Sequence, residues 1–438
     1  MGFLDRINIR LRQQGKTDSI QEPKNDGSEA FKYYLLGFML AVYPLIVIPY
    51  QQNYFYAPRY FILAIISLTA LFIIIREKIK LNHPAAVPLA AFLFFAVIST
   101  LLAPDKLTAL LGLPFRLTGF TTYFFCIILF ILAAQSVHSE KLLRAAIWSC
   151  VIVSLIAVLQ YIGINPVPHE YFRDKMISYG TMGNPNFLGT YTCFFLPAAI
   201  LSYIYSKKKC WLLAASLIYA GVLVSITRGV WISSFLVFLM VVWYCLKHKD
   251  WRRPIAITMI MFILVTAVLA PLRDGLILAR AGTIQREIKS GIELQDSAGA
   301  SRMYIWKECF KLLPENWLFG MGPEHLQFAK ITGSGNSRAL ADKAHNVYLE
   351  MAVTTGIFTL ISYLAFLSFF LRHRKGKREF LFFSMVAVYI VQAFFNIDVV
   401  MVMPVWWIIL GLSLAPGKPA PCKVDMTRAD EGTILPGT

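Results

Sequence analysis

Long apolar stretches recur along almost the whole chain and limit what it can fold into. About twelve of them carry almost no charge over roughly 17 to 25 residues, the length that a helix needs to cross a bilayer. A chain with 57% hydrophobic residues and a mean hydropathy of +0.59 is too apolar for a soluble protein. We therefore expect an all-α integral membrane protein with about twelve transmembrane helices. The stretches lie near residues 33–50, 60–75, 84–103, 118–137, 142–163, 187–206, 210–226, 229–247, 254–272, 346–371, 380–397 and 399–415.

The predicted spans divide the chain into consecutive parts. Residues 1–30 are polar and lack the apolar core and cleavage site of a signal peptide, so we expect a cytosolic N-terminal arm. Residues 31–272 would hold the first nine transmembrane helices, and residues 346–415 the last three. Residues 273–345 would form one large extracytoplasmic loop. Residues 416–438 would form a disordered cytosolic tail.

The positions of Lys and Arg predict on which side each loop lies. Alternate loops are basic, whereas the short loops between them hold few cations. Because cytoplasmic loops carry the excess of Lys and Arg, we expect both termini in the cytoplasm and the large loop outside. The net charge of +17 then reflects topology and attraction to anionic lipid headgroups, with no need for a nucleic-acid partner.

The large loop contains a candidate surface helix and many cations. Residues 301–313 have apolar side chains at helical spacing, with Ser301 able to cap the start and Pro314 just after the end. We interpret this segment as an interfacial helix on the outer membrane surface. A turn at 320–323 and a mobile loop at 333–337 follow it. The cations break the positive-inside pattern, and an anionic ligand would explain them. They are Arg280, Arg286, Lys289, Arg302, Lys307, Lys311, Lys330, Arg338 and Lys343.

Three side chains are candidates for chemistry where the outer loops meet the spans. His345 stands at the outer end of a span, where a neutral imidazole could accept a proton from an attacking hydroxyl or could simply cap the helix. Arg228 lies in a very short outer connection and could bind a lipid diphosphate or ordinary headgroups. Arg302 begins the interfacial helix and could clamp phosphate or anchor that helix.

Amides and one further arginine lie near the same face. Asn184 and Asn186 flank a proline at the outer start of a span, where they could cap the helix or bind sugar hydroxyls. Asn346 follows His345 where the polar segment re-enters a span, and Arg116 lies in the outer loop before the fourth span. We take these residues as candidates for substrate binding.

Several common motifs are missing from the outer loops. They contain no Asp-x-Asp pair, no His-Glu-x-x-His and no cysteine cluster, so we expect no bound metal or other cofactor. No phosphate-binding Gly-x-x-x-x-Gly-Lys appears in the chain, and ATP-driven transport is unsupported. The candidate polar residues gather outside, where nucleotide sugars are absent. A glycan donor there must be linked to a lipid.

Taken in order, these segments resemble the O-antigen ligase and O-antigen polymerase-related family of integral membrane glycan transferases. Their order and spacing fit over roughly residues 110 to 370. The matching pieces are Gly183-Asn184-Pro185-Asn186-Phe187-Leu188, Thr227-Arg228-Gly229, Ser301-Arg302-x-x-Ile305-Trp306 with Leu318-Phe319-Gly320-Met321-Gly322, and His345-Asn346-x-x-Leu349-Glu350 with Thr355-Gly356.

The resemblance implies a metal-independent, inverting glycosyltransferase of the bacterial cytoplasmic (inner) membrane, with its active site on the extracytoplasmic face. The implied donor is a glycan on undecaprenyl diphosphate. By the same resemblance Arg228 and Arg302 would hold the donor diphosphate, and His345 would activate or orient the acceptor hydroxyl. Membrane lipids would surround the enzyme.

The acceptor stays open at this point. A core sugar of lipopolysaccharide, built on lipid A, would make the protein a ligase, and another lipid-linked repeat would make it a polymerase of O-antigen, capsule or a related polysaccharide. A protein hydroxyl or a cell-wall polymer would be a further acceptor within the family. From another class, a flippase or exporter of lipid-linked glycans would also have about twelve spans. We favour the ligase-like reading within cell envelope biogenesis.

Overall fold

The computed structural model describes residues 26–48, 55–167, 178–331, 341–372 and 376–416, and every regular element in these ranges is helical. In chain order the elements are α2 (Asp26–Ala41), η1 (Tyr43–Leu45), α3 (Ala57–Arg76), α4 (Ala86–Leu102), α5 (Lys106–Leu111), α6 (Phe120–Ala133), α7 (Ser139–Tyr161), α8 (Pro185–Ser206), α9 (Lys209–Val224), α10 (Arg228–Leu246), α11 (Lys249–Leu269), α12 (Leu272–Gly282), α13 (Ile284–Ile292), α14 (Ala298–Asn316), η3 (Leu326–Ala329), α15 (Val347–Thr354), α16 (Ile357–Leu371), α17 (Lys377–Ala393) and α18 (Met403–Leu414). The predicted loop at 333–337, most of the predicted N-terminal arm and nearly all of the predicted tail lie outside the described residues.

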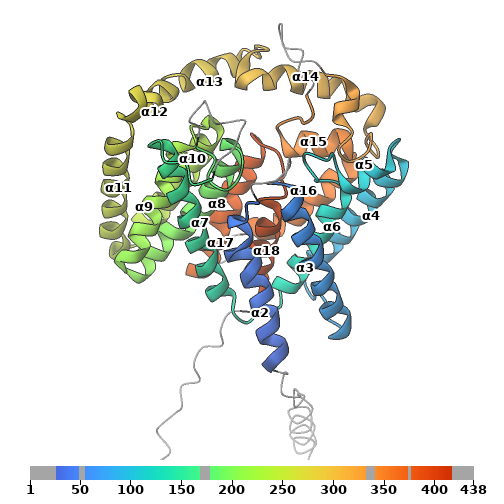
Figure 1. Ribbon diagram of the computed structural model, residues 1–438, viewed down its shortest axis with the longest axis horizontal. Helices are drawn as coiled ribbons and strands as arrows, with labels where there is room; N and C mark the ends of the chain where they lie inside the picture. Colours follow the sequence, from blue (N-terminus) through green and yellow to red (C-terminus); the bar gives the residue numbers. More distant parts are fainter. Residues whose placement is uncertain (1–25, 49–54, 168–177, 332–340, 373–375, 417–438) are drawn as a thin grey trace, which may run out of the picture.

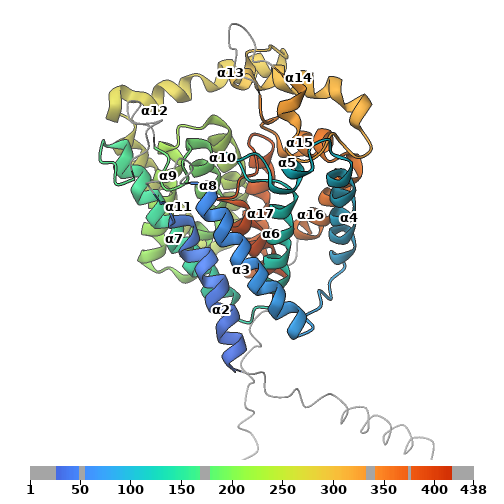
Figure 2. The same cartoon turned by 45° about the vertical axis from the view of Figure 1, so that its right-hand side comes forward.

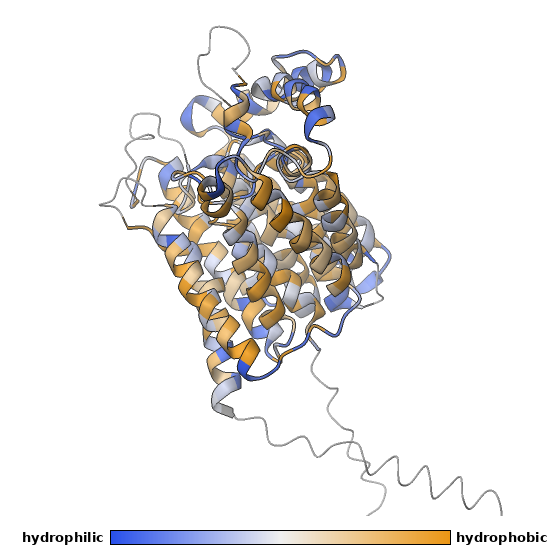
Figure 3. Ribbon diagram, turned by 90° about the vertical axis from the view of Figure 1, so that its right-hand side faces the viewer, coloured by the Kyte–Doolittle hydropathy of each residue, from blue (hydrophilic) through white to orange (hydrophobic). Residues whose placement is uncertain are grey.

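The long helices pack side by side into a bundle, and α12, α13 and α14 cross one end of it as an arch (Figures 1 and 2). Figure 3 shows the hydropathy of the two parts, with mostly apolar helices in the bundle and much of the polar surface on the arch and the loops at the ends. α8 lies in the interior of the bundle, because 94% of its most apolar window is buried by its neighbours. A helix that is apolar on all sides is expected in such a position.

A helix overlies each of the apolar stretches that the sequence predicts. Five helices are long and apolar enough to cross a membrane, namely α3, α7, α8, α10 and α11. Five shorter apolar helices accompany them, namely α4, α6, α9, α16 and α18. The described residues therefore fit an all-α membrane protein, whereas the total of about twelve spans stays a prediction.

The predicted stretch over residues 346–371 is not one continuous helix, because two helices, α15 and α16, share it, and whether it crosses the membrane as one span stays a prediction. Between them Gly356 adopts a φ of +86°, which L side chains rarely adopt. Backbone of the outer loop fills the break: Met321 N–H donates to the Val353 carbonyl at 3.1 Å, and Ile357 N–H donates to the Trp317 carbonyl at 2.8 Å. The break thus anchors the loop to the bundle.

Helix α14 begins earlier and ends later than the predicted interfacial helix over 301–313. Ser301 does not cap it, because the Ser301 N–H already donates to the Ser297 carbonyl at 3.2 Å. Pro314 lies inside its last turn, where a proline removes only one late hydrogen bond. Ile305 and Cys309 of α14 are buried in one small cluster with residues of α15. Its contact with the membrane surface stays a prediction.

Candidate functional site

A cavity of about 860 Å³ lies between the arch and the end of the bundle that the arch crosses. Its wall comes from the start of α8, the connection from α9 to α10, and the inner faces of α12, α13 and α14. Four of the described residues that line it are arginines. The only acidic residue among the described lining residues is Glu287. The arginines are Arg228, Arg273, Arg280 and Arg302.

A tight connection places Arg228 at the mouth of the bundle. Ile226 has a φ of +52°, which turns the chain between α9 and α10, and Arg228 is the first residue of α10. A Cβ at Gly229 would come within 2.8 Å of the Phe395 side chain, so the glycine allows α10 to start in close contact with that ring. The Arg228 guanidinium reaches the arch, where it pairs with Glu287 and its Nη1 donates to Thr283 Oγ1 at 3.3 Å.

The arginines of the cavity repel one another more than Glu287 can compensate. Burial, together with the positive charges of Arg228 and Arg280, lowers the pKa of Arg302 to about 10. Burial and Arg228 also lower the pKa of Arg280. Glu287 opposes both shifts, but its second carboxylate oxygen already accepts the Gly299 N–H at 2.8 Å. Added negative charge in this cavity would relieve the repulsion.

His345 lies beside this cavity, in the segment that leads into α15. Burial lowers the pKa of its imidazole to about 4, and the positive charge of Arg302 contributes to the shift. The ring is therefore neutral near pH 7. Its Nδ1 has no hydrogen-bond partner among the residues that the structure describes. Trp306, which lines the cavity, holds the preceding residue, because its Nε1 donates to the Ala344 carbonyl at 2.8 Å.

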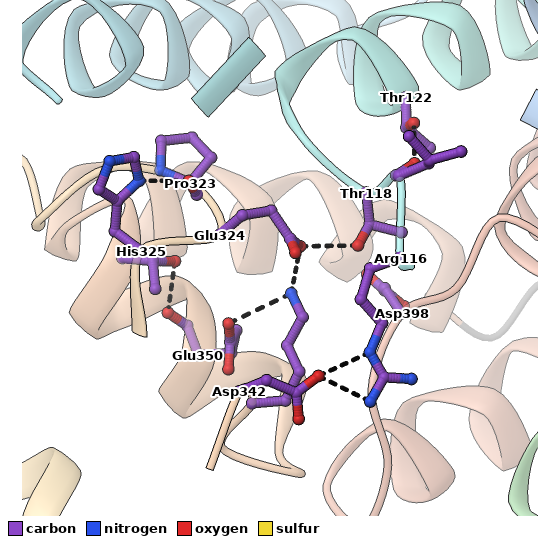
Figure 4. Close-up of polar contacts among 12 residues, drawn as sticks. Arg116, Thr118, Thr122, Pro323, Glu324, His325, Asp342, Glu350 and Asp398 are labelled. Atoms are coloured by element: carbon purple, nitrogen blue, oxygen red, sulfur yellow. Dashed lines mark hydrogen bonds and ion pairs between the residues drawn. The ribbon is translucent and has the colours of Figure 1, made fainter. Parts of the chain in front are cut away.

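Lys343, two residues before His345, belongs to a buried charge cluster, which consists of Glu324, Lys343 and Glu350 (Figure 4). Lys343 pairs with Glu324 and lies 3.3 Å from Glu350 Oε1. Glu324 also accepts the Thr118 hydroxyl at 2.6 Å, and Glu350 Oε2 accepts the Ala344 N–H at 2.6 Å. The cluster thereby fixes the backbone on the N-terminal side of His345.

A scan against family models matches residues 212–364 to the family described as O-antigen ligase. Over these residues the chain is similar to the O-antigen ligase family. This confirms the resemblance seen in the sequence and supports an enzyme that acts on a lipid-linked glycan and an acceptor. The match runs from α9 to α16 and includes the whole arch, Arg228, Arg302 and His345. A search of the curated proteins finds no match.

Only some of the predicted site residues lie together. Arg228, Arg302 and Asn186 line the cavity, and His345 is close enough to Arg302 to feel its charge. Asn186 Oδ1 also accepts the Thr227 hydroxyl at 3.4 Å. Their predicted roles in catalysis and substrate binding stay predictions.

The other predicted binding residues make structural contacts. Asn184 and Asn346 are the N-caps of α8 and α15: Asn184 Oδ1 accepts the Asn186 N–H at 2.9 Å, and Asn346 Oδ1 accepts the Tyr348 N–H at 3.0 Å. Arg116 forms an ion pair with Asp342 at 2.7 Å. None of the three is among the residues that line the cavity.

Sequence reasoning missed Arg273 and Glu287, and it placed Arg280 only among the loop cations that an anionic ligand would explain. A signal exists, because Leu276, Arg280, Ile284 and Ile288 follow one another at intervals of four residues and all line the cavity. Such spacing places side chains on one helical face. No local pattern, however, joins α12 and α13 into an arch over Arg228. In the described part of the chain no group of three or more His, Cys, Asp or Glu could hold a metal ion.

Proposed function

We propose that this protein transfers a glycan from undecaprenyl diphosphate to an acceptor hydroxyl at the outer face of a bacterial cytoplasmic membrane, as an O-antigen ligase does. The observation that carries the proposal is the cavity in which Arg228, Arg280 and Arg302 face one carboxylate. A diphosphate would supply the negative charge that the cavity lacks, and guanidinium groups bind phosphate oxygens through paired hydrogen bonds.

In the proposed reaction the acceptor oxygen attacks the anomeric carbon of the donor sugar and inverts it. The bond from this carbon to the phosphate oxygen breaks, and its electron pair stays on the diphosphate. Arg228 and Arg302 would stabilise the charge that develops there, a role that preorganised cations fill well in a site shielded from water. The arginines would thereby take the place of a divalent metal ion.

His345 would accept the proton of the acceptor hydroxyl. In the unliganded protein the imidazole is neutral, which a base requires, but its low pKa makes it a weak one. A diphosphate on Arg302 would cancel the positive charge that contributes to this low pKa. Donor binding would therefore strengthen the base just before it is needed.

The cavity does not choose between a ligase and a polymerase, because the two differ in the acceptor. A flippase is the alternative from another class. It would have to present its cations to both sides of the membrane, whereas the four arginines of this cavity all lie at the arch end.

The test is a reconstituted assay with an extracted polyprenyl-diphosphate glycan, with and without lipid-A core, and with products separated by size. Wild type is compared with His345→Ala and with Lys289→Ala, whose exposed lysine does not line the cavity. One glycan added to lipid-A core in wild type and in Lys289→Ala, and lost in His345→Ala, supports the ligase. A ladder from donor alone indicates a polymerase. No covalent product with any acceptor would overturn the proposal.

A further inference from the structure

A second cavity, of about 280 Å³, lies at the end of the bundle that faces away from the arch. It is built from the start of α7, the end of α8, the start of α9 and the start of α17. α7 and α8 are two of the helices that are long and apolar enough to cross a membrane. The cavity therefore lies where these helices reach the bilayer surface, at the level of lipid headgroups.

The charges around this cavity leave a positive surplus. Arg144, Lys377 and Arg378 line it, and the only acid among its described lining residues is Glu140. Glu140 lies 3.7 Å from Arg144, but both side chains are more than half exposed, so solvent weakens the pair. Glu379 also acts on Arg378. Three cations against these two carboxylates leave one positive charge, which equals the charge of a single phosphodiester in magnitude.

The three cations differ in how firmly their side chains are held. Arg378 is held in place, because its Nη2 donates to the Leu412 carbonyl at 2.8 Å and to the Ala415 carbonyl at 2.9 Å. Its Nε is buried without a hydrogen-bond partner among the described residues. Lys377 lies 5.7 Å from the ring centroids of Tyr205 and Trp251. One guanidinium is therefore fixed, while Lys377 and Arg144 can adjust to a ligand.

The helix ends and the apolar walls favour the same kind of ligand. α7 and α17 both begin at the cavity, and the N-terminal end of a helix attracts an anion. Leu381 and Phe382 form part of the wall. From Arg144 an exposed apolar stripe continues along α7 through Trp148, Ile152 and Leu155, where acyl chains could lie.

We propose that this cavity binds the headgroup of an anionic phospholipid. The phosphodiester lies between Arg144, Lys377 and Arg378, and the acyl chains follow the exposed stripe of α7. Basic pockets between transmembrane helices bind such headgroups in other membrane proteins. The site is independent of the transfer reaction, because its residues lie at the opposite end of α8 from the arginine cavity.

The test measures lipid binding to the detergent-purified full chain by native mass spectrometry, with phosphatidylglycerol and phosphatidylcholine as probes. The test variant is Arg144→Gln with Lys377→Gln; Arg378 stays in place because it holds the end of α18. The control variant is Lys249→Gln with Arg253→Gln, which removes two exposed cations at the same end that do not line the cavity. Size-exclusion chromatography checks that both variants are folded.

We expect wild type and the control to prefer phosphatidylglycerol, and the test variant to lose about fivefold in that affinity for each cation removed. Equal binding of both lipids by wild type would overturn the proposal. An equal loss in the control would also overturn it, because it would reduce the effect to general surface charge. Inorganic phosphate that displaces phosphatidylglycerol at equal concentration would reassign the site to a free anion.

Discussion

Two charged regions lie close together at the outer-loop end of the molecule, and they are built differently. In the arginine cavity Arg228, Arg280 and Arg302 face one carboxylate across a volume of about 860 Å³. In the buried charge cluster Lys343 is in contact with both Glu324 and Glu350, and almost no side-chain surface of Lys343 or Glu324 is exposed. Surplus charge beside a large cavity points to a ligand, whereas paired charge beside a space of only about 40 Å³ points to a structural role.

The comparison predicts the largest effect for Arg302→Ala. If the cavity holds the donor diphosphate, this variant should lower kcat/KM for transfer by about a thousandfold while it stays folded, because a transition-state cation is lost. The measurement is the reconstituted transfer assay together with thermal unfolding in detergent. Lys289→Ala is the control and should behave as wild type. Near-normal transfer by Arg302→Ala would remove this residue from the donor site.

In contrast to Arg302→Ala, Lys343→Met should mainly lower the stability of the fold. Removal of the cation leaves two buried carboxylates without an opposite charge, which typically costs about 3–5 kcal/mol of unfolding free energy. Thermal unfolding measures the effect, and Lys311→Met, which removes an exposed cation, is the control. An unchanged melting temperature with lost transfer would mean that the cluster takes part in the reaction, and the distinction between the two regions would fail.

Glu287→Gln tests the arginine cavity by removing its negative charge instead of one of its positive charges. The carboxylate pairs with Arg228 in the unliganded protein and would compete with a donor diphosphate for that guanidinium. Glutamine, its neutral isostere, should therefore lower KM for the donor by about fivefold. This factor corresponds to the interaction free energy of a partly exposed charge pair. Steady-state kinetics with varied donor measures this, with Glu293→Gln as the control. A higher KM would show that Glu287 helps to hold the donor.

The pH dependence of kcat/KM for transfer should differ from that expected for a histidine of ordinary pKa. The pKa of His345 lies below its ordinary value of 6.5, at about 4, so the neutral ring persists as the pH falls through 6. The pH profile of kcat/KM, which reports the free enzyme, should stay flat from pH 7 to about pH 5 and fall below that. His345→Gln should lack this fall. A midpoint near 6.5 in wild type would contradict the buried neutral imidazole.

The smallest expected effect is that of a chelator. If arginines neutralise the leaving diphosphate, EDTA should leave the rate of transfer unchanged. The control is the same assay after addition of excess Mg²⁺. Loss of activity with EDTA and rescue by one divalent ion would contradict the metal-independent mechanism.

The sequence predicted much of the helical architecture, because apolar length and charge placement depend on local residues alone. It also indicated Arg228 and Arg302, which both line the cavity. It could not show that Arg116 is paired with Asp342, or that Glu287 faces Arg228, because these contacts join segments far apart in the chain. The break at Gly356 was missed, because the hydrogen bonds that stabilise it come from residues 317–322.

The backbone contact between residues 317–322 and the break before α16 ties the loop to the helical bundle. Gly320 and Gly356 lie so close to the opposite backbone that a side chain on either would collide with it. A fragment cut at the predicted loop borders, 273 and 345, would separate these two partners. To exchange acceptor preference between related enzymes, one would therefore have to transplant residues 317–322 together with the break before α16.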